Sequence, residues 1–147
     1  MIFSDKLEKI LSELEKDNSK FKFILDKVLK FAVNLFNTVK DLQEELEDLD
    51  EIYQAYIEDA DMQYWIKVSE GKMEYHQGIN KEASIHAWFT RKLIIGILKG
   101  EIMGSEAYMK GLIKAEGSLS KGLRYIKLYR LFFKYIHAKF EINGFPG

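Results

Sequence analysis

The 147-residue chain contains no cysteine and only one proline. Without cysteine it can form no disulfide, thiolate metal site or thiol nucleophile, so these chemistries are excluded. Histidine is also scarce: His76, His86 and His137 are the only three, and they lack a metal-ligand spacing. Residues 1–10 alternate charged and apolar types, so we expect neither a signal peptide nor a membrane span there. The sequence therefore predicts no metal and no cofactor, and we expect a cytoplasmic protein.

The chain also lacks an excess of charge of either sign. Lysine plus arginine number 22 against 23 aspartate plus glutamate, which gives no electrostatic argument for binding nucleic acid. The carboxylates fall in solvated runs, and no Ser-His-Asp, Gly-x-Ser-x-Gly or phosphate-loop pattern occurs. We therefore expect a protein that is not an enzyme, and no residue is predicted to be catalytic.

The first fifty residues predict helices. Apolar residues at helical spacing indicate one helix over 3–14 and a second over 21–46. The second ends in the acidic stretch 41–51, where negative charge at a helix C-terminus opposes the dipole, so we expect a break near 47–50. Residues 1–50 are thus interpreted as an N-terminal helical segment preceding a domain over 51–140 and a tail over 141–147.

A run of strands follows this segment. Residues 52–58, 62–69 and 72–77 are rich in Tyr, Ile and Val and are separated by short polar turns, a pattern typical of hairpins. Alternation also predicts a strand over 85–89, and 112–117 supplies the last one. In the second strand one set of side chains is expected to point inward: Met62, Tyr64, Ile66 and Val68.

Between the last two predicted strands lies an unusually apolar segment, Leu93-Ile94-Ile95-Gly96-Ile97-Leu98. Thr90 stands where an N-cap would begin a helix that ends near Gly100. This helix has almost no polar side, so more than one neighbouring element must cover it. We interpret the region from 83 to 117 as strand, apolar helix, small-residue turn and strand.

The end of this region carries the motif Ala107-Tyr108-Met109-Lys110-Gly111, followed by Ile113-Lys114-Ala115-Glu116-Gly117 and preceded by Leu98-Lys99-Gly100. These residues resemble the sterol carrier protein family of non-specific lipid-transfer domains, whose pattern is a short helix ending in Leu-x-x-Gly and then Ala-Phe/Leu-Met-x-Gly-Lys-Leu-Lys-x-x-Gly. The resemblance extends from about residue 52 to 136. Leu112 stands where that pattern has lysine, and Gly104 where it often has proline.

This resemblance implies an α+β fold: a five-stranded, mostly antiparallel sheet with helices on one face, here with two additional N-terminal helices. It further implies a hydrophobic tunnel that binds or transfers a fatty acid, fatty acyl-coenzyme A, sterol or similar lipid. On pattern alone the same side chains could simply fill the core. The residues expected to line the tunnel are Ile94, Ile95, Leu98, Ile102, Met103, Met109, Leu123 and Ile126.

A terminal helix is predicted over 119–140, and it has a basic strip. Cations recur every three or four residues between Glu116 and Glu141, where no acidic residue occurs. Such a strip can contact anionic lipid headgroups or the phosphates of an acyl-coenzyme A. It can equally be an ordinary solvated face. The residues predicted for headgroup or membrane contact are Lys121, Arg124, Lys127 and Arg130.

Two tryptophans, Trp65 and Trp88, are expected to project from the sheet face opposite the inward set. Exposed tryptophans suggest a contact surface, and a homodimer is one possibility. Partial cover by Lys67 and the N-terminal helices is the alternative. Two other functions therefore remain open: a non-catalytic protein-interaction module with a collapsed cavity, or an accessory subunit of a lipid-metabolising enzyme.

Overall fold

The structure is a computed structural model, which describes residue 9, residues 13–14 and residues 16–142. The sheet has the strand order β3-β2-β1-β4-β5, in which only β1 and β4 are parallel neighbours. Its strands are β1 Glu51–Ile57, β2 Met62–Ser69, β3 Lys72–Gln77, β4 Ile85–Phe89 and β5 Lys114–Glu116. The predicted α+β class with a five-stranded, mostly antiparallel sheet is confirmed.

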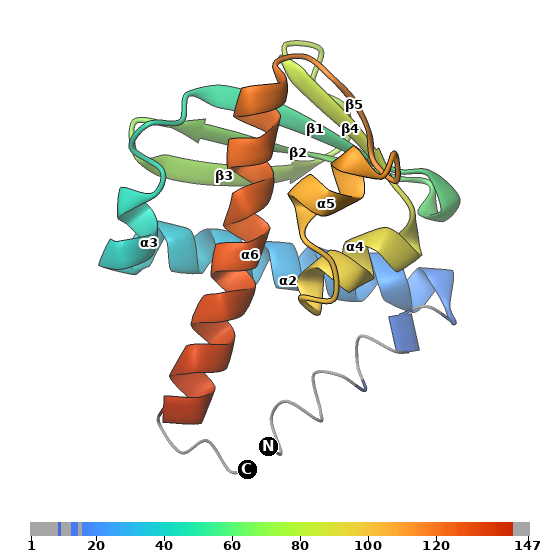
Figure 1. The fold of residues 1–147 in the computed structure, drawn as a ribbon, viewed down its shortest axis with the longest axis horizontal. Helices are drawn as coiled ribbons and strands as arrows, with labels where there is room; N and C mark the ends of the chain where they lie inside the picture. Colours follow the sequence, from blue (N-terminus) through green and yellow to red (C-terminus); the bar gives the residue numbers. More distant parts are fainter. Residues whose placement is uncertain (1–8, 10–12, 15, 143–147) are drawn as a thin grey trace.

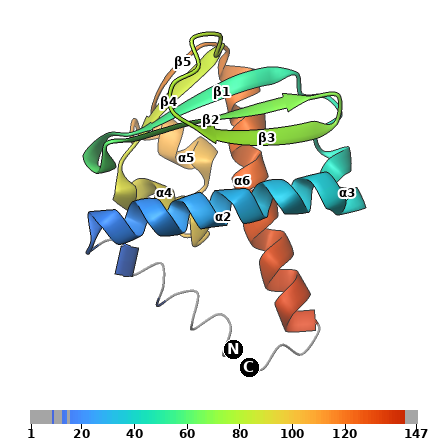
Figure 2. The same ribbon diagram turned by 180° about the vertical axis from the view of Figure 1, so that it is seen from behind.

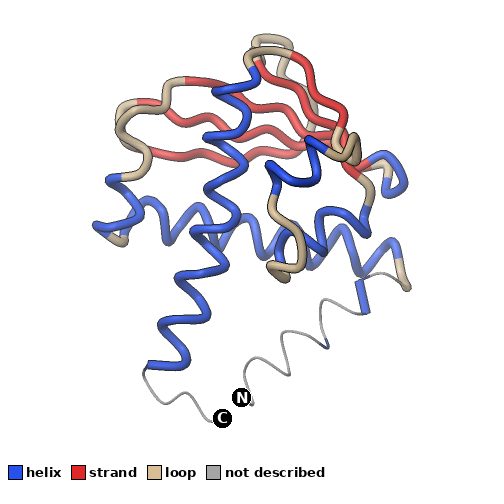
Figure 3. Tube along the Cα trace, viewed as in Figure 1, coloured by secondary structure: helices blue, strands red, loops and turns tan. Residues whose placement is uncertain are grey.

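The helices lie together on one side of this sheet. They are α2 Asn18–Thr38, α3 Lys40–Glu44, the 3-10 turn η1 Glu58–Ala60, α4 Arg91–Leu98, α5 Gly104–Met109 and α6 Leu119–Ile142. Figure 1 shows α6 descending across the sheet and then across α2, and Figure 2 shows the same crossing from behind. In Figure 3 the strands form one layer and the helices the other.

Side-chain alternation in the strands produces the core between these two layers. In β2 the predicted inward set is buried, whereas the residues between its members are half-buried on the other face. The helices contribute Phe21, Leu25 and Phe36 of α2 and most of α4 to the same cluster. The N-terminal helix α2 is thus part of the same core as the sheet.

The parallel pairing of β1 and β4 depends on a crossover connection. Residues 78–84 leave β3 at one edge of the sheet and reach β4 on the far side of β1. Gln54 of β1, the only buried polar side chain among the described residues apart from tyrosines, holds this segment. Its amide nitrogen donates to the carbonyl oxygens of Gly78 (3.0 Å) and Tyr64 (3.0 Å), and its oxygen accepts from the backbone N–H of Asn80 (2.8 Å).

Helix α2 protects the free edge of the sheet. The amide of Asn37 donates to the carbonyl oxygen of Met73 and accepts from its N–H, both at 2.8 Å, so the edge strand β3 is hydrogen-bonded on its outer side. Such pairing blocks edge-to-edge association. Further along, Asp26 accepts hydrogen bonds from Tyr75 (2.8 Å) and Gln77 (3.0 Å).

The predicted helix over 21–46 is interrupted earlier than expected. Val39 has extended backbone angles, φ −87° and ψ 118°, so the chain changes direction there and again after Glu44, ahead of the predicted break at 47–50. These turns bring Leu42, Leu46 and Leu49 into the core immediately before β1. Packing decides the position of the break, whereas the acidic run only weakens the helix end.

The segment predicted as a small-residue turn contains the helix α5. Gly104 at its first position, and the absence of a side-chain hydrogen bond at its N-cap Met103, hid this helix from the sequence analysis. The following strand β5 is shorter than predicted. By contrast, the Thr90 cap of α4 is confirmed, because its hydroxyl accepts from the N–H of Leu93 (3.2 Å).

Two sequence expectations concern the ends of the chain. Most of the predicted helix over 3–14, and residues 143–147 of the tail, lie outside the described residues. Within the described part of the chain, no helix has both the length and the apolar character needed to span a bilayer.

Candidate functional site

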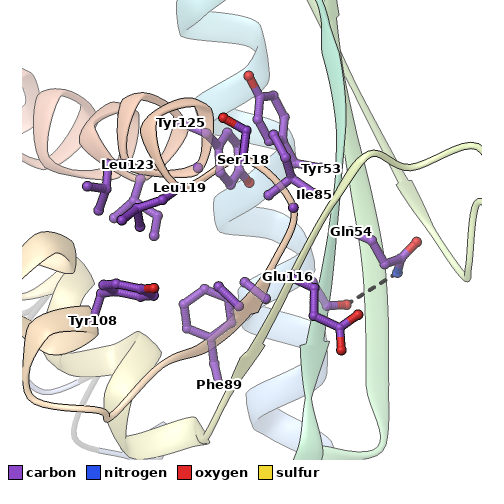
Figure 4. A pocket seen from close by; sticks show the side chains of 16 residues that line it. Tyr53, Gln54, Ile85, Phe89, Tyr108, Glu116, Ser118, Leu119, Leu123 and Tyr125 are labelled. Carbon is purple, nitrogen blue, oxygen red and sulfur yellow. Dashed lines mark hydrogen bonds between the residues drawn. The ribbon is translucent and has the colours of Figure 1, made fainter.

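A hollow lies between the first turns of α6, helix α5 and the inner face of β1, β4 and β5 (Figure 4). We call it the α6 cavity. Its wall is largely apolar and includes Tyr53, Ala55, Ile85, Ala87, Phe89, Tyr108, Leu119, Gly122, Leu123, Tyr125 and Ile126. Its wall is formed by five elements, of which β1 and β4 are distant in the sequence from the consecutive α5, β5 and α6.

Glycines set the width of the α6 cavity. Gly122 in the first turn of α6 faces β4, and a Cβ there would meet Cγ2 of Ile85 at 3.6 Å. Gly117, with φ +106°, forms the turn into α6, and a Cβ there would lie 2.4 Å from the carbonyl oxygen of Ser84. Only glycine allows this close approach of the α6 start to the sheet.

Helix α5 forms the opposite wall. A Cβ on Gly104 would lie 1.7 Å from Cγ2 of Ile126, so the glycine lets α5 pack directly on α6. This explains why glycine occupies a position where the sterol carrier pattern often has proline. Ala107 of α5 is fully buried, and Tyr108 points its ring toward the cavity in Figure 4.

Tyrosines form the end of the α6 cavity that lies across from Tyr108. The ring of Tyr125 stacks on Tyr53 with 4.1 Å between centroids. The Tyr125 hydroxyl is 2.6 Å from that of Tyr129, which is 2.7 Å from that of Tyr64. We call Tyr64, Tyr129 and Tyr125 the phenol chain.

Burial changes the protonation behaviour of these phenols. Loss of solvent raises the pKa of each member of the phenol chain well above its ordinary value, because a buried phenolate is poorly solvated. Burial likewise raises the pKa of Tyr53 to about 12, and its hydroxyl has no hydrogen-bond partner among the described residues. All four phenols are therefore neutral at physiological pH.

Beyond Tyr125 lies a second, smaller hollow, which we call the α2 cavity. It has a volume of about 20 Å³, whereas the α6 cavity has about 40 Å³. Since one water needs roughly 10–15 Å³ of such volume, neither holds a hydrocarbon chain in this conformation. The α2 cavity is lined by Leu29, Ala32, Val33, Phe36, Ile66, Met73, Tyr125, Leu128, Tyr129 and Phe132.

The eight residues predicted to line a tunnel are not all brought together. Leu123 and Ile126 line the α6 cavity. Ile94, Ile95 and Leu98 are buried in the core on α4. The side chains of Met103 and Met109 are exposed to 47% and 80%, respectively.

The remaining predicted residue, Ile102, lines an open groove beside α4, which we call the α4 groove. This groove is larger, with a volume of about 430 Å³, but it lies on the surface and includes the charged residues Lys92 and Glu101. A hydrocarbon there would stay in contact with water. The α6 cavity is therefore the better candidate for an apolar ligand.

The four predicted headgroup cations fall into two groups. Lys121 forms an ion pair with Glu51, and Arg124 donates to the carbonyl oxygen of Asp48 at 3.1 Å. These two attach the start of α6 to the start of β1. Lys127 and Arg130 are exposed and have no ion-pair partner in the described part of the chain.

The sheet face away from the helices is covered with aromatic rings, as the alternation predicts. Trp88 stacks on Tyr56 at 4.8 Å, and Trp65 stacks on His76 at 4.4 Å. The hydroxyl of Tyr56 is 3.0 Å from Nδ1 of His86. We call these five residues the outer aromatic face.

Among the described residues, no group of three or more His, Asp or Glu side chains could hold a metal ion. The ring pairs of His76 and His86 instead belong to the outer aromatic face. The site consists of apolar walls and neutral phenols, which suit noncovalent binding of an apolar molecule.

The apolar hollow between the sheet and the terminal helix is the kind of concave, mostly apolar site at which small molecules bind. The profile of the SCP-2 sterol transfer family matches residues 33–130, about two thirds of the chain. The chain therefore belongs to this family, which supports lipid or sterol binding or transfer in general terms. A comparison with curated proteins gives no match.

Solved structures show the same fold. The chain is similar to the UbiJ-SCP2 ubiquinone synthesis protein, with a TM-score of 0.60 and 10% identity over 76% of this chain and 98% of that one. It is also similar to apo sterol carrier protein 2 from Yarrowia lipolytica, with a TM-score of 0.57 and 11% identity over 70% and 87% of the two chains.

A third similar structure is an enzyme, the inverting sec-alkylsulfatase Pisa1 from Pseudomonas sp.. The TM-score is 0.53 at 17% identity, over 58% of this chain but only 14% of the sulfatase. This chain thus spans a small part of that enzyme. Domains of this family are generally non-catalytic, although some solved structures that resemble this chain are parts of enzymes.

Most residues of the α6 cavity wall were not among those predicted to contact a ligand. Gly122 and Tyr125 lie on the predicted terminal helix, yet they were not singled out, and Tyr108 lies on α5, which was predicted as a turn. Ile85 and Phe89 alternate with Trp88, which was expected on the opposite face of the sheet, so the alternation was a usable signal for both. No sequence pattern pointed to Tyr125, because a tyrosine between basic residues on a helix is typical of a surface.

Proposed function

We propose that this chain binds a fatty acid, fatty acyl-coenzyme A, sterol or related lipid in the α6 cavity, and that it carries the lipid between membranes or to a partner enzyme. The observation that carries the proposal is the apolar hollow walled by Leu119, Leu123 and Phe89, in a chain of the SCP-2 sterol transfer family. Burial of each methylene contributes about 0.8 kcal/mol, so a medium acyl chain needs few polar contacts.

Binding requires the α6 cavity to widen. Its volume of about 40 Å³ is too small for an acyl chain, so α5 must move relative to the first turns of α6. The rim suits such a movement, because Leu119 is 47% exposed and β5 is only three residues long. Opening there leaves the hydrogen-bonded pairing of the four longer strands intact.

Native mass spectrometry of freshly purified protein, followed by organic extraction, tests this function. We expect a bound species that solvent extracts as a lipid, and displacement of a fluorescent acyl probe by added lipid. Protein that carries no lipid and fails to bind the probe would refute the proposal.

Membrane contact is a separate part of the proposal and involves Lys127 and Arg130. Each cation near an anionic surface contributes about 1 kcal/mol. Lys127→Glu/Arg130→Glu should lower association with anionic vesicles in a salt-sensitive manner while leaving probe binding in solution unchanged. Equal loss in both assays would contradict this division of roles.

The outer aromatic face favours a second function, that of a protein-interaction module or accessory subunit. Trp65 and Trp88 are half-buried on a sheet face that no described helix covers. A second copy of the chain or a catalytic partner could bind there. Analytical ultracentrifugation tests the homodimer: Trp65→Ser/Trp88→Ser should convert a dimer to a monomer, and a wild-type monomer at high concentration would exclude it.

A further inference from the structure

The α6 cavity and the α2 cavity follow one another along helix α6. The α6 cavity lies under the first two turns of this helix, against β1 and β4, and the α2 cavity lies under the next two turns, against β2, β3 and α2. Figure 1 shows the same course, because α6 starts at the sheet and its later turns cross α2. Among the described residues, Tyr125 alone lines both cavities, so its ring stands between them.

The ring of Tyr125 is held in this position from several sides. It stacks on Tyr53 with 4.1 Å between the centroids, and the ring of Tyr129 meets it edge-on at 5.3 Å. Its hydroxyl is 2.6 Å from that of Tyr129, which is 2.7 Å from that of Tyr64 on β2. Rotating the ring away would break a hydrogen bond between buried groups, which is costly. The phenol chain therefore braces the ring between the helix layer and the sheet.

The position of this ring sets two lengths. The rim of the α6 cavity is at Leu119, which is 47% exposed. Because an α-helix rises about 1.5 Å per residue, Tyr125 lies about 9 Å from Leu119 along the axis of α6. Phe132, the last α6 residue that lines the α2 cavity, lies about 20 Å from it. The first distance is comparable to a medium acyl chain such as octanoate or decanoate, and the second to palmitate.

We propose that Tyr125 limits the length of acyl chain that the α6 cavity accepts. This inference rests on the proposed lipid-binding function and narrows its ligand class to medium chains. The polar head of the lipid stays in water at the rim, because a carboxylate buried without a cationic partner is costly. The methyl end then points toward Tyr125, and methylenes beyond the ring add nothing to the affinity.

The α2 cavity is the extension that Tyr125 closes off. Its wall is apolar and includes Leu29, Val33 and Phe36 of α2, so hydrocarbon would suit it. A smaller residue at position 125 would remove the ring between the two hollows and join them into one. The side chain at this single position therefore decides whether a long chain can extend beneath α6 as far as α2.

A series of fatty acids of increasing length tests the inference in the wild-type protein. Hexanoate, octanoate, decanoate, laurate and palmitate are each delivered from cyclodextrin to displace a fluorescent acyl probe, and affinities are expressed for the free fatty acid. Burial of one more methylene should raise the affinity about fourfold. We expect this rise up to octanoate or decanoate, where the chain reaches Tyr125, and no further rise from decanoate to palmitate.

Three variants locate the limit. Tyr125→Leu removes the ring, so the ratio of palmitate to decanoate affinity should rise about tenfold or more, as two or more methylenes become buried. Phe132→Leu is the matched control, because it replaces a buried ring in the α2 cavity by the same residue but leaves Tyr125 in place; its ratio should equal that of wild type. Tyr125→Leu/Ala32→Leu fills the α2 cavity again and should cancel the gain.

The outcomes separate this inference from the proposed function. A wild-type affinity that keeps rising from decanoate to palmitate would overturn the inference, and so would equal ratios in wild type and Tyr125→Leu. In both cases displacement of the probe still upholds the function. Failure of the wild type to bind the probe and every fatty acid would overturn both. Circular dichroism checks the fold of Tyr125→Leu, and if it does not fold, the wild-type series decides alone.

Discussion

Replacing Gly122 by alanine should change stability and ligand binding in opposite directions. Gly122 is the fourth residue of α6, and its backbone is helical, so alanine fits without strain. Alanine in a helix is favoured over glycine by about 0.5–1 kcal/mol. The new methyl would meet Cγ2 of Ile85 at 3.6 Å, an ordinary packing distance, so we expect the full gain.

The same methyl occupies the α6 cavity, whose volume is only about 40 Å³. A ligand must then be accommodated in a narrower space, and overpacking costs about 1–3 kcal/mol. The dissociation constant for an acyl probe should therefore rise about fivefold or more. Thermal unfolding of the ligand-free protein should shift upward by roughly 1–4 °C.

Gly96→Ala is the matched control. Gly96 lies within α4, and a Cβ there would meet Cγ2 of Ile102 at 3.5 Å, a similar contact outside the α6 cavity. This variant should gain similar stability and keep the probe affinity. A Gly122→Ala protein that is stabilised but binds the probe as tightly as wild type would refute the placement of the ligand between α6 and β4.

Three further predictions concern the scaffold around the site. Gly104→Ala should lower the free energy of unfolding in urea by about 1–3 kcal/mol, since its Cβ would overlap Ile126; no loss would contradict the close packing of α5 on α6. Gln54→Leu should lower the free energy of unfolding by about 2–4 kcal/mol, because it removes the hydrogen bonds that hold the crossover segment 78–84. The control Gln63→Leu, on the same face of the sheet, should lower it by less than about 1 kcal/mol. Similar losses in the two variants would contradict the role of Gln54 in the crossover. Hydrogen bonds from Lys121 and Ser84 lower the pKa of Glu51 below its ordinary 4.5, so its stabilising contribution is complete above about pH 4.5 and is lost as the pH falls through the folded-state pKa. Glu51→Gln should therefore flatten the acid side of a plot of stability against pH, and an unchanged slope would contradict the pairing.

Local patterns were sufficient for most of the elements. Alternation in β2 and β4 marked both strands and their inward faces, and the Thr90 cap located the start of α4. These patterns failed at α5. A glycine such as Gly104 usually indicates the end of a helix, whereas in the structure it allows α5 to pack closely on α6. They also misplaced the helix break, because the preference of Leu42 and Leu46 for the core outweighs the local charge pattern.

The candidate site was less predictable than the fold. The motif at 107–117 correctly indicated the family. Leu123 and Ile126, predicted as ligand contacts, lie on α6 and line the α6 cavity. The apolar residues of α4 attracted attention because they are conspicuous, yet Ile94 and Ile95 are packed in the core. Met109 looked like a ligand contact and is largely exposed.

The sequence alone determined which residues form strands and helices, which side of each is apolar, and the family. Strands, helices and their apolar sides depend on residues two to four positions apart, and this spacing can be read directly from one sequence. Only the tertiary structure decided that β1 pairs with β4 in parallel, that Gly104 meets Ile126, and that three tyrosines from β2 and α6 share hydrogen bonds. Periodicity identifies the face an element buries, but which faces meet is settled by the packing of the whole core.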